Sequence, residues 1–153
     1  MISRSPLRVI CFALFLAFAC ADSNPLGPSA DADVVVFAEL VNTHRESVGC
    51  PLLEWDSDVA EVAQRHSEDM VARNFFDHAN PDGLSPFDRL AAAGILYSRA
   101  AENIAAGQPT TQAALDAWLG SPGHRANIED CALTHHGVGL LERHWTHLFI
   151  TPW

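Results

Sequence analysis

The sequence contains no lysine. Its nine basic residues are all arginines, they stand against 19 acidic residues, and the formal net charge is -10. Without a basic face the chain cannot neutralise a row of phosphates, which argues against nucleic-acid binding. A continuous run of about 20 apolar residues is also lacking, which argues against a membrane-spanning helix. Because the chain has 153 residues and 48% of them are hydrophobic, we expect one ordered domain.

The N-terminal segment has the features of an export signal. Arg4 and Arg8 precede eleven apolar residues, Val9 to Ala19, a length typical of a signal-peptide core. Residues 1–19 are therefore excluded from the fold. Residues 16–20 resemble a bacterial lipoprotein signal, with Ala17 where a leucine usually stands. Cys20 is then either lipidated, which would attach the domain to a membrane, or near the start of a secreted protein. Both alternatives predict an exported protein, either secreted or anchored as a lipoprotein, and the lipoprotein resemblance implies a bacterial cell envelope.

Cysteine is scarce in the rest of the chain. Cys11 leaves with the signal segment, so Cys50 and Cys131 are the pair within the domain. In an oxidising compartment we expect them to form a disulfide, worth about 4 kcal/mol on the chain-entropy model. The alternative is two unrelated buried thiols. Neither cysteine has C-x-x-C spacing, which argues against metal binding by this pair.

The apolar pattern predicts helices early in the chain. Residues 20–32, rich in Pro, Gly, Ser and Asp, are expected to form a flexible tether, and residues 33–153 the domain. A helical period runs from Asp33 to about Val48. Further helix starts are marked by N-cap and first-turn residues: Asp56, Ser85 with Pro86, and Thr110 or Thr111.

Short strands are predicted towards the end of the chain. Residues 136–142 and 144–151 are rich in Val, Leu, Thr and aromatic side chains, and Arg143 separates them. Another short strand is expected near residues 97–101. Because the predicted helices come early in the chain and the predicted strands late, we expect an α+β fold with a small antiparallel sheet.

Eight histidines are many for a chain of this size. His44 and His66 lie on helical faces that pack, His135 and His136 should point to opposite faces of a strand, and His147 should be exposed or half-buried. The other three stand in loops or at a strand start, where functional side chains concentrate: His78, His124 and His144. Glu102 lies among small and apolar residues, so we expect a histidine, an arginine or a backbone amide beside it.

Several short motifs, in this order and at this spacing, resemble one known family. They are Leu40-Val41-Asn42 with Arg45, Leu53-Glu54-Trp55-Asp56, His66-Ser67-Glu68-Asp69-Met70, Phe76-Asp77-His78 with Asp82-Gly83, Glu102-Asn103-Ile104, Trp118 followed by Ser121-Pro122-Gly123-His124-Arg125-Ala126-Asn127-Ile128, Gly137-Val138-Gly139 and Trp145-Thr146. Together they resemble the bacterial branch of the superfamily of cysteine-rich secretory proteins, antigen 5 and pathogenesis-related 1 proteins, the CAP or SCP-like domain.

The resemblance implies an α-β-α sandwich with a small antiparallel sheet between helices. It also implies a cleft lined by two histidines and two glutamates, in which the histidines bind zinc in some members. On this basis the first histidine is similar to His78, the first glutamate to Glu102 and the second histidine to His144. The second glutamate has no counterpart, because Leu119-Gly120-Ser121 follows Trp118 and His124 stands nearby instead.

The first functional hypothesis is a monomeric, exported CAP domain without established turnover. It would bind a small ligand, a lipid, a peptide or a cell-wall fragment in a cleft formed by His78, Glu102, His124 and His144. The alternative is a zinc-dependent hydrolase with His78 and His144 as metal ligands and Glu102 or His124 moving a proton. A serine hydrolase is less favoured because the sequence lacks a G-x-S-x-G motif. An adhesion or stability module, whose surface matters more than its cleft, is the remaining alternative.

Overall fold

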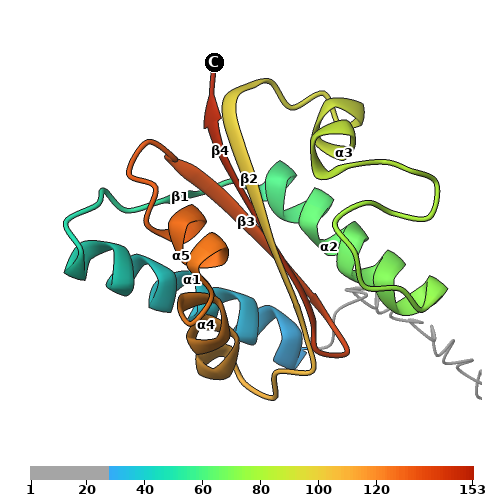
Figure 1. Cartoon of the computed structure of the whole chain (residues 1–153), viewed down its shortest axis with the longest axis horizontal. Helices are drawn as coiled ribbons and strands as arrows, with labels where there is room; N and C mark the ends of the chain where they lie inside the picture. The colour runs from blue at the N-terminus through green and yellow to red at the C-terminus, as the bar shows by residue number, and fades with distance from the viewer. Residues whose placement is uncertain (1–27) are drawn as a thin grey trace, which may run out of the picture.

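Residues 28–153 form three layers, and a four-stranded sheet is the middle one (Figure 1). These are the residues that the structure, a computed structural model, describes; the predicted signal segment, Cys20 and most of the predicted tether lie outside them. The strands lie side by side in the order β1-β3-β4-β2. Their bounds are β1 Glu54–Trp55, β2 Tyr97–Ala106, β3 His135–Leu141 and β4 His144–Pro152.

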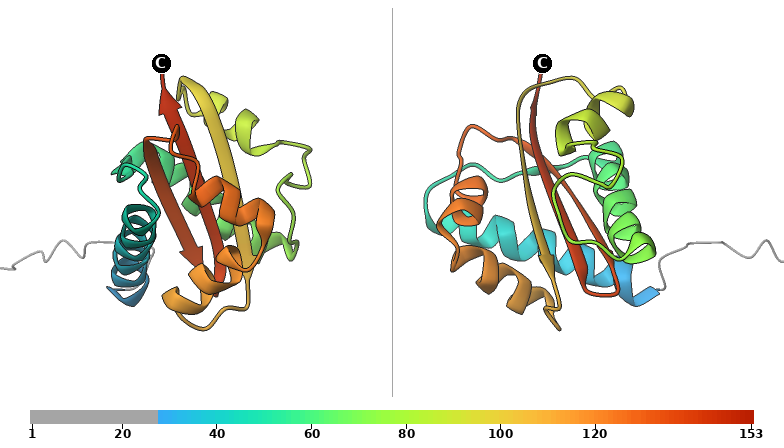
Figure 2. Two further views of the ribbon diagram at one scale, coloured as in Figure 1. Left: turned by 60° about the vertical axis from the view of Figure 1, so that its left-hand side comes forward. Right: turned by 45° about the vertical axis from the view of Figure 1, so that its right-hand side comes forward.

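Helices cover both faces of this sheet (Figure 2). On one face lie α2 (Ser57–Arg73) and α3 (Pro86–Ala92), and their apolar side chains form a core with Leu148 and Ile150 of β4. On the other lie α1 (Pro28–Ser47), α4 (Thr111–Leu119) and α5 (Pro122–Ile128), which form a second core with Trp145 and Phe149. Successive residues of β4 therefore enter the two cores in turn. The α-β-α sandwich implied by the family resemblance is confirmed.

The helix ends follow the local signals in the sequence. Asp56 is the N-cap of α2, and its carboxylate accepts hydrogen bonds from the backbone N–H groups of Asp58 and Val59. Ser85 and Asp88 form a reciprocal capping box at the start of α3, and Thr110 caps α4. These predicted helix starts are confirmed. None of the helices in residues 28–153 is both long and apolar enough to cross a bilayer.

Some elements differ from the sequence-based expectation. Helix α1 begins at Pro28, five residues before Asp33, so the end of the expected tether is helical. Strand β1 was not expected; it pairs in parallel with β3 and makes the sheet mixed. A strand of two residues is too short to show an alternating pattern. Strand β2 continues beyond the expected residues 97–101, and so includes Glu102.

A tight hairpin joins β3 to β4. Glu142 and Arg143 have φ angles of 44° and 64°, and a type I′ turn requires positive values at both positions. Leu141 pairs with His144 on either side of this turn. The predicted separation of two strands at Arg143 is confirmed.

Two glycines of β3 allow helix α2 to approach the sheet closely. A Cβ atom on Gly137 would lie 2.1 Å from the backbone nitrogen of Ala60, and one on Gly139 would lie 2.3 Å from that of Gln64. Both positions of β3 therefore require glycine while α2 stays in place.

The predicted disulfide between Cys50 and Cys131 is present. It joins the segment after α1 to the segment between α5 and β3, across 81 residues of sequence. The fully buried guanidinium of Arg45 reinforces the same junction, donating hydrogen bonds of 2.8 to 3.0 Å to four backbone carbonyls: those of Pro51, Ile128, Asp130 and Leu133. These bonds fix the position of α5 relative to α1.

His136 and His147 form a buried pair between β3 and β4. The distance from His136 Nδ1 to His147 Nε2 is 3.0 Å, and the residues are 1% and 0% exposed. The expectation that His147 is exposed or half-buried is wrong, because helices cover both faces of the strand. Burial lowers the pKa of His136 to about 4 and lowers the pKa of His147 strongly, so both rings are neutral at pH 7. His135 is half-buried on the opposite face, as alternation predicted.

Candidate functional site

The buried carboxylate of Glu102 is the centre of the candidate site. Its side chain is only 2% exposed and is bound by one histidine and one arginine. His78 Nδ1 lies 2.8 Å from one carboxylate oxygen, and Arg89 Nη2 lies 2.5 Å from the other. Of the expected partners, a histidine, an arginine or a backbone amide, Glu102 has the first two. Arg89, on the short helix α3, was not identified from the sequence as one of these partners.

Arg89 also shapes the loop that carries His78. Its Nη1 atom donates to the carbonyl oxygens of His78 at 2.8 Å and Leu84 at 3.1 Å. Within the loop, the side-chain oxygen of Asn80 accepts from the N–H groups of Asp82 and Leu84. One arginine therefore holds both the carboxylate and the loop that places the imidazole beside it.

The imidazole of His78 is the accessible part of this cluster. Its side chain is 48% exposed, whereas that of Arg89 is 10% exposed. The hydrogen bond to Glu102 raises the pKa of His78, and partial burial opposes this effect. Because Nδ1 faces a carboxylate acceptor, it carries the proton in the neutral ring, and protonation then adds an N–H donor at Nε2.

His124 lies on α5, which is hydrogen-bonded to β2 beside Glu102. The backbone carbonyl of His124 accepts from Asn103 Nδ2 at 3.0 Å. Asn127, one turn further along α5, donates to Asn103 Oδ1 at 2.8 Å and to the Glu102 carbonyl at 3.3 Å. Burial lowers the pKa of His124, and the neighbouring His78 imidazole lowers it further. His78, Glu102 and His124 are three of the four side chains of the cleft expected from the sequence, and this group is called the β2-edge cleft below.

The structure does not bring His144 into this cleft. His144 pairs with Ala106 at one end of β2, whereas Glu102 pairs with Leu148. Four residues of strand separate the two positions, about 14 Å at about 3.4 Å per residue. The ring of His144 faces the carbonyl of Glu142 at 3.3 Å instead. The register of the sheet therefore keeps His144 away from Glu102, whereas α5 holds His124 beside β2.

The remaining histidines have structural partners. His44 lies 2.9 Å from a carboxylate oxygen of Glu129, and His66 Nε2 lies 3.0 Å from the carbonyl of Asp77. His66 is buried as predicted, and its contact supports the loop that leads to His78.

The zinc site of the alternative hypothesis, with His78 and His144 as ligands, does not fit these residues. Nδ1 of His78 and both oxygens of Glu102 are already engaged, which leaves His78 Nε2 and the His124 ring as free donors. Catalytic zinc sites usually have three protein ligands. Among residues 28–153, no group of three or more His, Cys, Asp or Glu side chains is arranged to hold a metal ion.

Comparison with known families identifies the class of protein. The model of the Cysteine-rich secretory protein family (CAP) matches residues 38–146, well over half of the chain. The chain therefore belongs to this family, and the resemblance drawn from its motifs is confirmed.

Two proteins of Bacillus subtilis are similar to this chain. The uncharacterized protein YkwD is 42% identical over 130 residues, which are 84% of this chain and 50% of that protein. The uncharacterized membrane protein YlbC is 40% identical over 115 residues, which are 75% of this chain and 33% of that protein. The chain thus spans half or less of the length of these relatives.

Solved structures share the fold. An extracellular protein containing an SCP domain from Bacillus anthracis has a TM-score of 0.78 and 36% identity, covering 84% of this chain and 45% of that one. An outer surface protein of Borrelia burgdorferi has a TM-score of 0.76 at 19% identity, covering 81% of this chain and 96% of that one.

Proposed function

We propose that this chain is an exported CAP domain of the bacterial cell envelope that binds a small ligand bearing a carboxylate in the β2-edge cleft. A peptide or a peptide-bearing cell-wall fragment has this chemistry. The main observation behind the proposal is the orientation of the His78 ring. Its Nδ1 is hydrogen-bonded to the buried carboxylate of Glu102, while the side chain as a whole is half exposed.

The charges of the cluster favour an anionic group. Arg89 balances the negative charge of Glu102, so protonation of His78 gives the three side chains a net positive charge. The raised pKa of His78 extends this state towards neutral pH. A ligand carboxylate can then accept a charge-assisted hydrogen bond from Nε2–H. We expect affinity to fall as the pH rises through the pKa of His78.

Export is supported by the disulfide and by the relatives. The Cys50–Cys131 bond is typical of oxidising compartments. One solved relative is an extracellular protein and another an outer surface protein. Attachment through a lipidated Cys20 is the finer form of this proposal. Mass spectrometry of the intact exported protein tests it, because acylation adds the mass of the lipid to the N-terminal residue, whereas simple secretion adds none.

The binding proposal is tested with soluble cell-wall fragments that carry free carboxylates. We expect them to shift the NMR signals of the His78 and His124 rings, and a His78→Ala variant to lose this binding. A His135→Ala variant is the matched control, because His135 is half-buried on β3 and outside the cleft. Equal binding by the two variants, or no shift at His78 in the unmodified protein, would contradict the proposal.

A further inference from the structure

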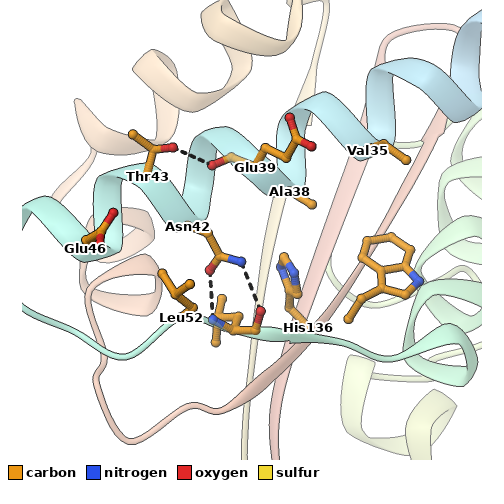
Figure 3. A pocket seen from close by; sticks show the side chains of 10 residues that line it. Val35, Ala38, Glu39, Asn42, Thr43, Glu46, Leu52 and His136 are labelled. Atoms are coloured by element: carbon orange, nitrogen blue, oxygen red, sulfur yellow. Dashed lines mark hydrogen bonds between the residues drawn. The ribbon is translucent and has the colours of Figure 1, made fainter.

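A concave surface lies at the opposite edge of the sheet from the β2-edge cleft residues. A hollow of about 640 Å³ lies between helix α1 and the segment leading into β1, with His136 between them (Figure 3). A second hollow of about 400 Å³ lies between α1 and α2, and Val35 and Trp55 line both. The two together are called the α1–β1 groove. Each has the size of an ordinary ligand pocket.

The walls of the groove expose apolar side chains. Val35 and Leu52 are each 57% exposed and Trp55 is 46% exposed, although the domain has two cores in which such residues could be buried. Clustered apolar exposure around a concave surface marks a binding site more often than scattered exposure does.

The groove also contains an unpaired section of sheet edge. Strand β1 pairs with β3 only at His135 and His136, so β3 extends beyond the end of β1. On this edge the carbonyl of His136 accepts from the N–H of Asp56, and the N–H of Leu140 donates to the side chain of Gln64. Val138 lies between these two residues, so its backbone N–H and C=O point to the same edge.

Val138 lines the second hollow and is only 3% exposed. Within residues 28–153, neither the loop and side-chain hydrogen bonds nor the two-residue pairing with β1 provides a partner for its N–H or C=O on that edge. Buried backbone groups without a partner are rare in folded proteins. An extended peptide lying in the hollow would supply both partners, accepting from the N–H and donating to the C=O.

The acidic residues of the groove favour a peptide with basic side chains. Glu39 and Glu46 on α1 line the first hollow, and both are exposed. Glu61 on α2 lines the second and is also exposed, but it forms an ion pair with Arg65. The described residues that line the two hollows include no arginine. A second copy of this chain would bring a net charge of -10 and no lysine, so like charges oppose self-association here.

We propose that the α1–β1 groove docks an extended segment of a partner protein in which lysine or arginine alternates with apolar residues. One residue of the segment pairs with the backbone of Val138, its apolar side chains pack on Val35 and Trp55, and its basic side chains face the glutamates. This site is independent of the β2-edge cleft.

The test is an NMR titration of the ¹⁵N-labelled protein with three probes. The first is a blocked heptapeptide of alternating lysine and valine, the second has glutamate in place of each lysine, and the third is benzyltrimethylammonium, a small apolar cation. We expect the lysine peptide to shift the Val138 amide and the Trp55 indole saturably, and the glutamate peptide to bind at least tenfold more weakly. A His78→Ala variant should bind the lysine peptide unchanged.

A charge-matched pair of variants checks the glutamates. Glu39→Gln with Glu46→Gln should weaken lysine-peptide binding at least fivefold, whereas Asp116→Asn with Glu142→Gln, which changes the net charge equally away from the groove, should not. Equal weakening by both pairs, similar affinity of the glutamate peptide when read at the Val138 amide, or lysine-peptide shifts confined to the β2-edge cleft would overturn the proposal. Saturation of the groove by the small cation without any peptide effect on Val138 would also overturn it, in favour of a small-molecule pocket.

Discussion

Acidification should destabilise this domain through the buried pair His136 and His147. Both rings are neutral in the folded protein, because burial lowers the pKa of His136 to about 4 and that of His147 in the same direction. In the unfolded chain a histidine titrates near its ordinary pKa of about 6.5. Between these values the unfolded state binds more protons, so folding stability is fully present above about pH 6.5 and is lost as the pH falls towards 4.

The size of the effect follows from the two pKa values of His136. Each pH unit in this window changes the free energy of unfolding by about 1.4 kcal/mol. Between pH 7.5 and pH 5, the titration of His136 alone should lower the free energy of unfolding by about 2 kcal/mol. Over the whole range from pH 6.5 to pH 4 the loss should reach about 3 kcal/mol. His147 adds to this loss with the same sign.

Urea unfolding at pH 7.5 and pH 5.0 measures this loss. The comparison is with a His136→Phe, His147→Phe double variant, which keeps two rings at the site but removes both titrating groups. The original protein should lose at least about 2 kcal/mol more than the variant between the two pH values. A His135→Gln control should retain the full loss. If the double variant lost as much stability as the original protein, the assignment of a neutral buried pair would be refuted.

Three further predictions concern stability and are read from urea unfolding. Replacing both Cys50 and Cys131 with alanine should lower the free energy of unfolding by about 4 kcal/mol, because the bond closes a loop of 81 residues; an unchanged midpoint would contradict this. Arg45→Lys should lower the free energy of unfolding by about 3 kcal/mol or more, because one ammonium group cannot donate to all four separate carbonyls. A loss below about 1 kcal/mol would show that the carbonyls find other hydrogen-bond donors. Gly139→Ala should lower the free energy of unfolding by at least about 2 kcal/mol, because the new Cβ would displace α2. Gly123→Ala is the control: its Cβ would meet nothing within 4 Å, so stability should change by less than about 1 kcal/mol. Equal effects of the two substitutions would show that the contact with Gln64 relaxes freely.

Much of the fold could be predicted because its signals are local. Asp56, Ser85 and Thr110 each act on backbone groups within three residues, so their capping roles are visible in the sequence. The hairpin at Arg143 is local for the same reason. Strand β1 was missed because its two residues are fixed by β3, about 80 residues later in the chain.

The candidate site was predicted in part for the same physical reason. The small and apolar neighbours of Glu102 were enough to predict that its carboxylate needs a hydrogen-bonding or charged partner, but not which one. The choice between His124 and His144 depends on where α5 crosses the sheet and on the register of β2 with β4, which no local pattern encodes. Arg89 was missed because nothing in the residues around it indicates a contact with Glu102, which follows 13 residues later.

The burial of His147 was missed through an assumption about the sheet. Alternation shows that His147 and Thr146 point to opposite faces, but it does not show whether either face is open to solvent. Here helices cover both faces, so both residues are fully buried.

The central claim is that His78, Glu102 and His124 share one cleft, and NMR titration of the histidine rings tests it most directly. The pKa of His78 should lie above 6.5 in the original protein and fall in a Glu102→Gln variant, because the hydrogen-bonded carboxylate raises it. The pKa of His124 should lie below 6.5 and rise in a His78→Ala variant but not in a His144→Ala variant. A His78 pKa that does not respond to Glu102→Gln, or a His124 pKa that responds to His144 instead of His78, would contradict the account.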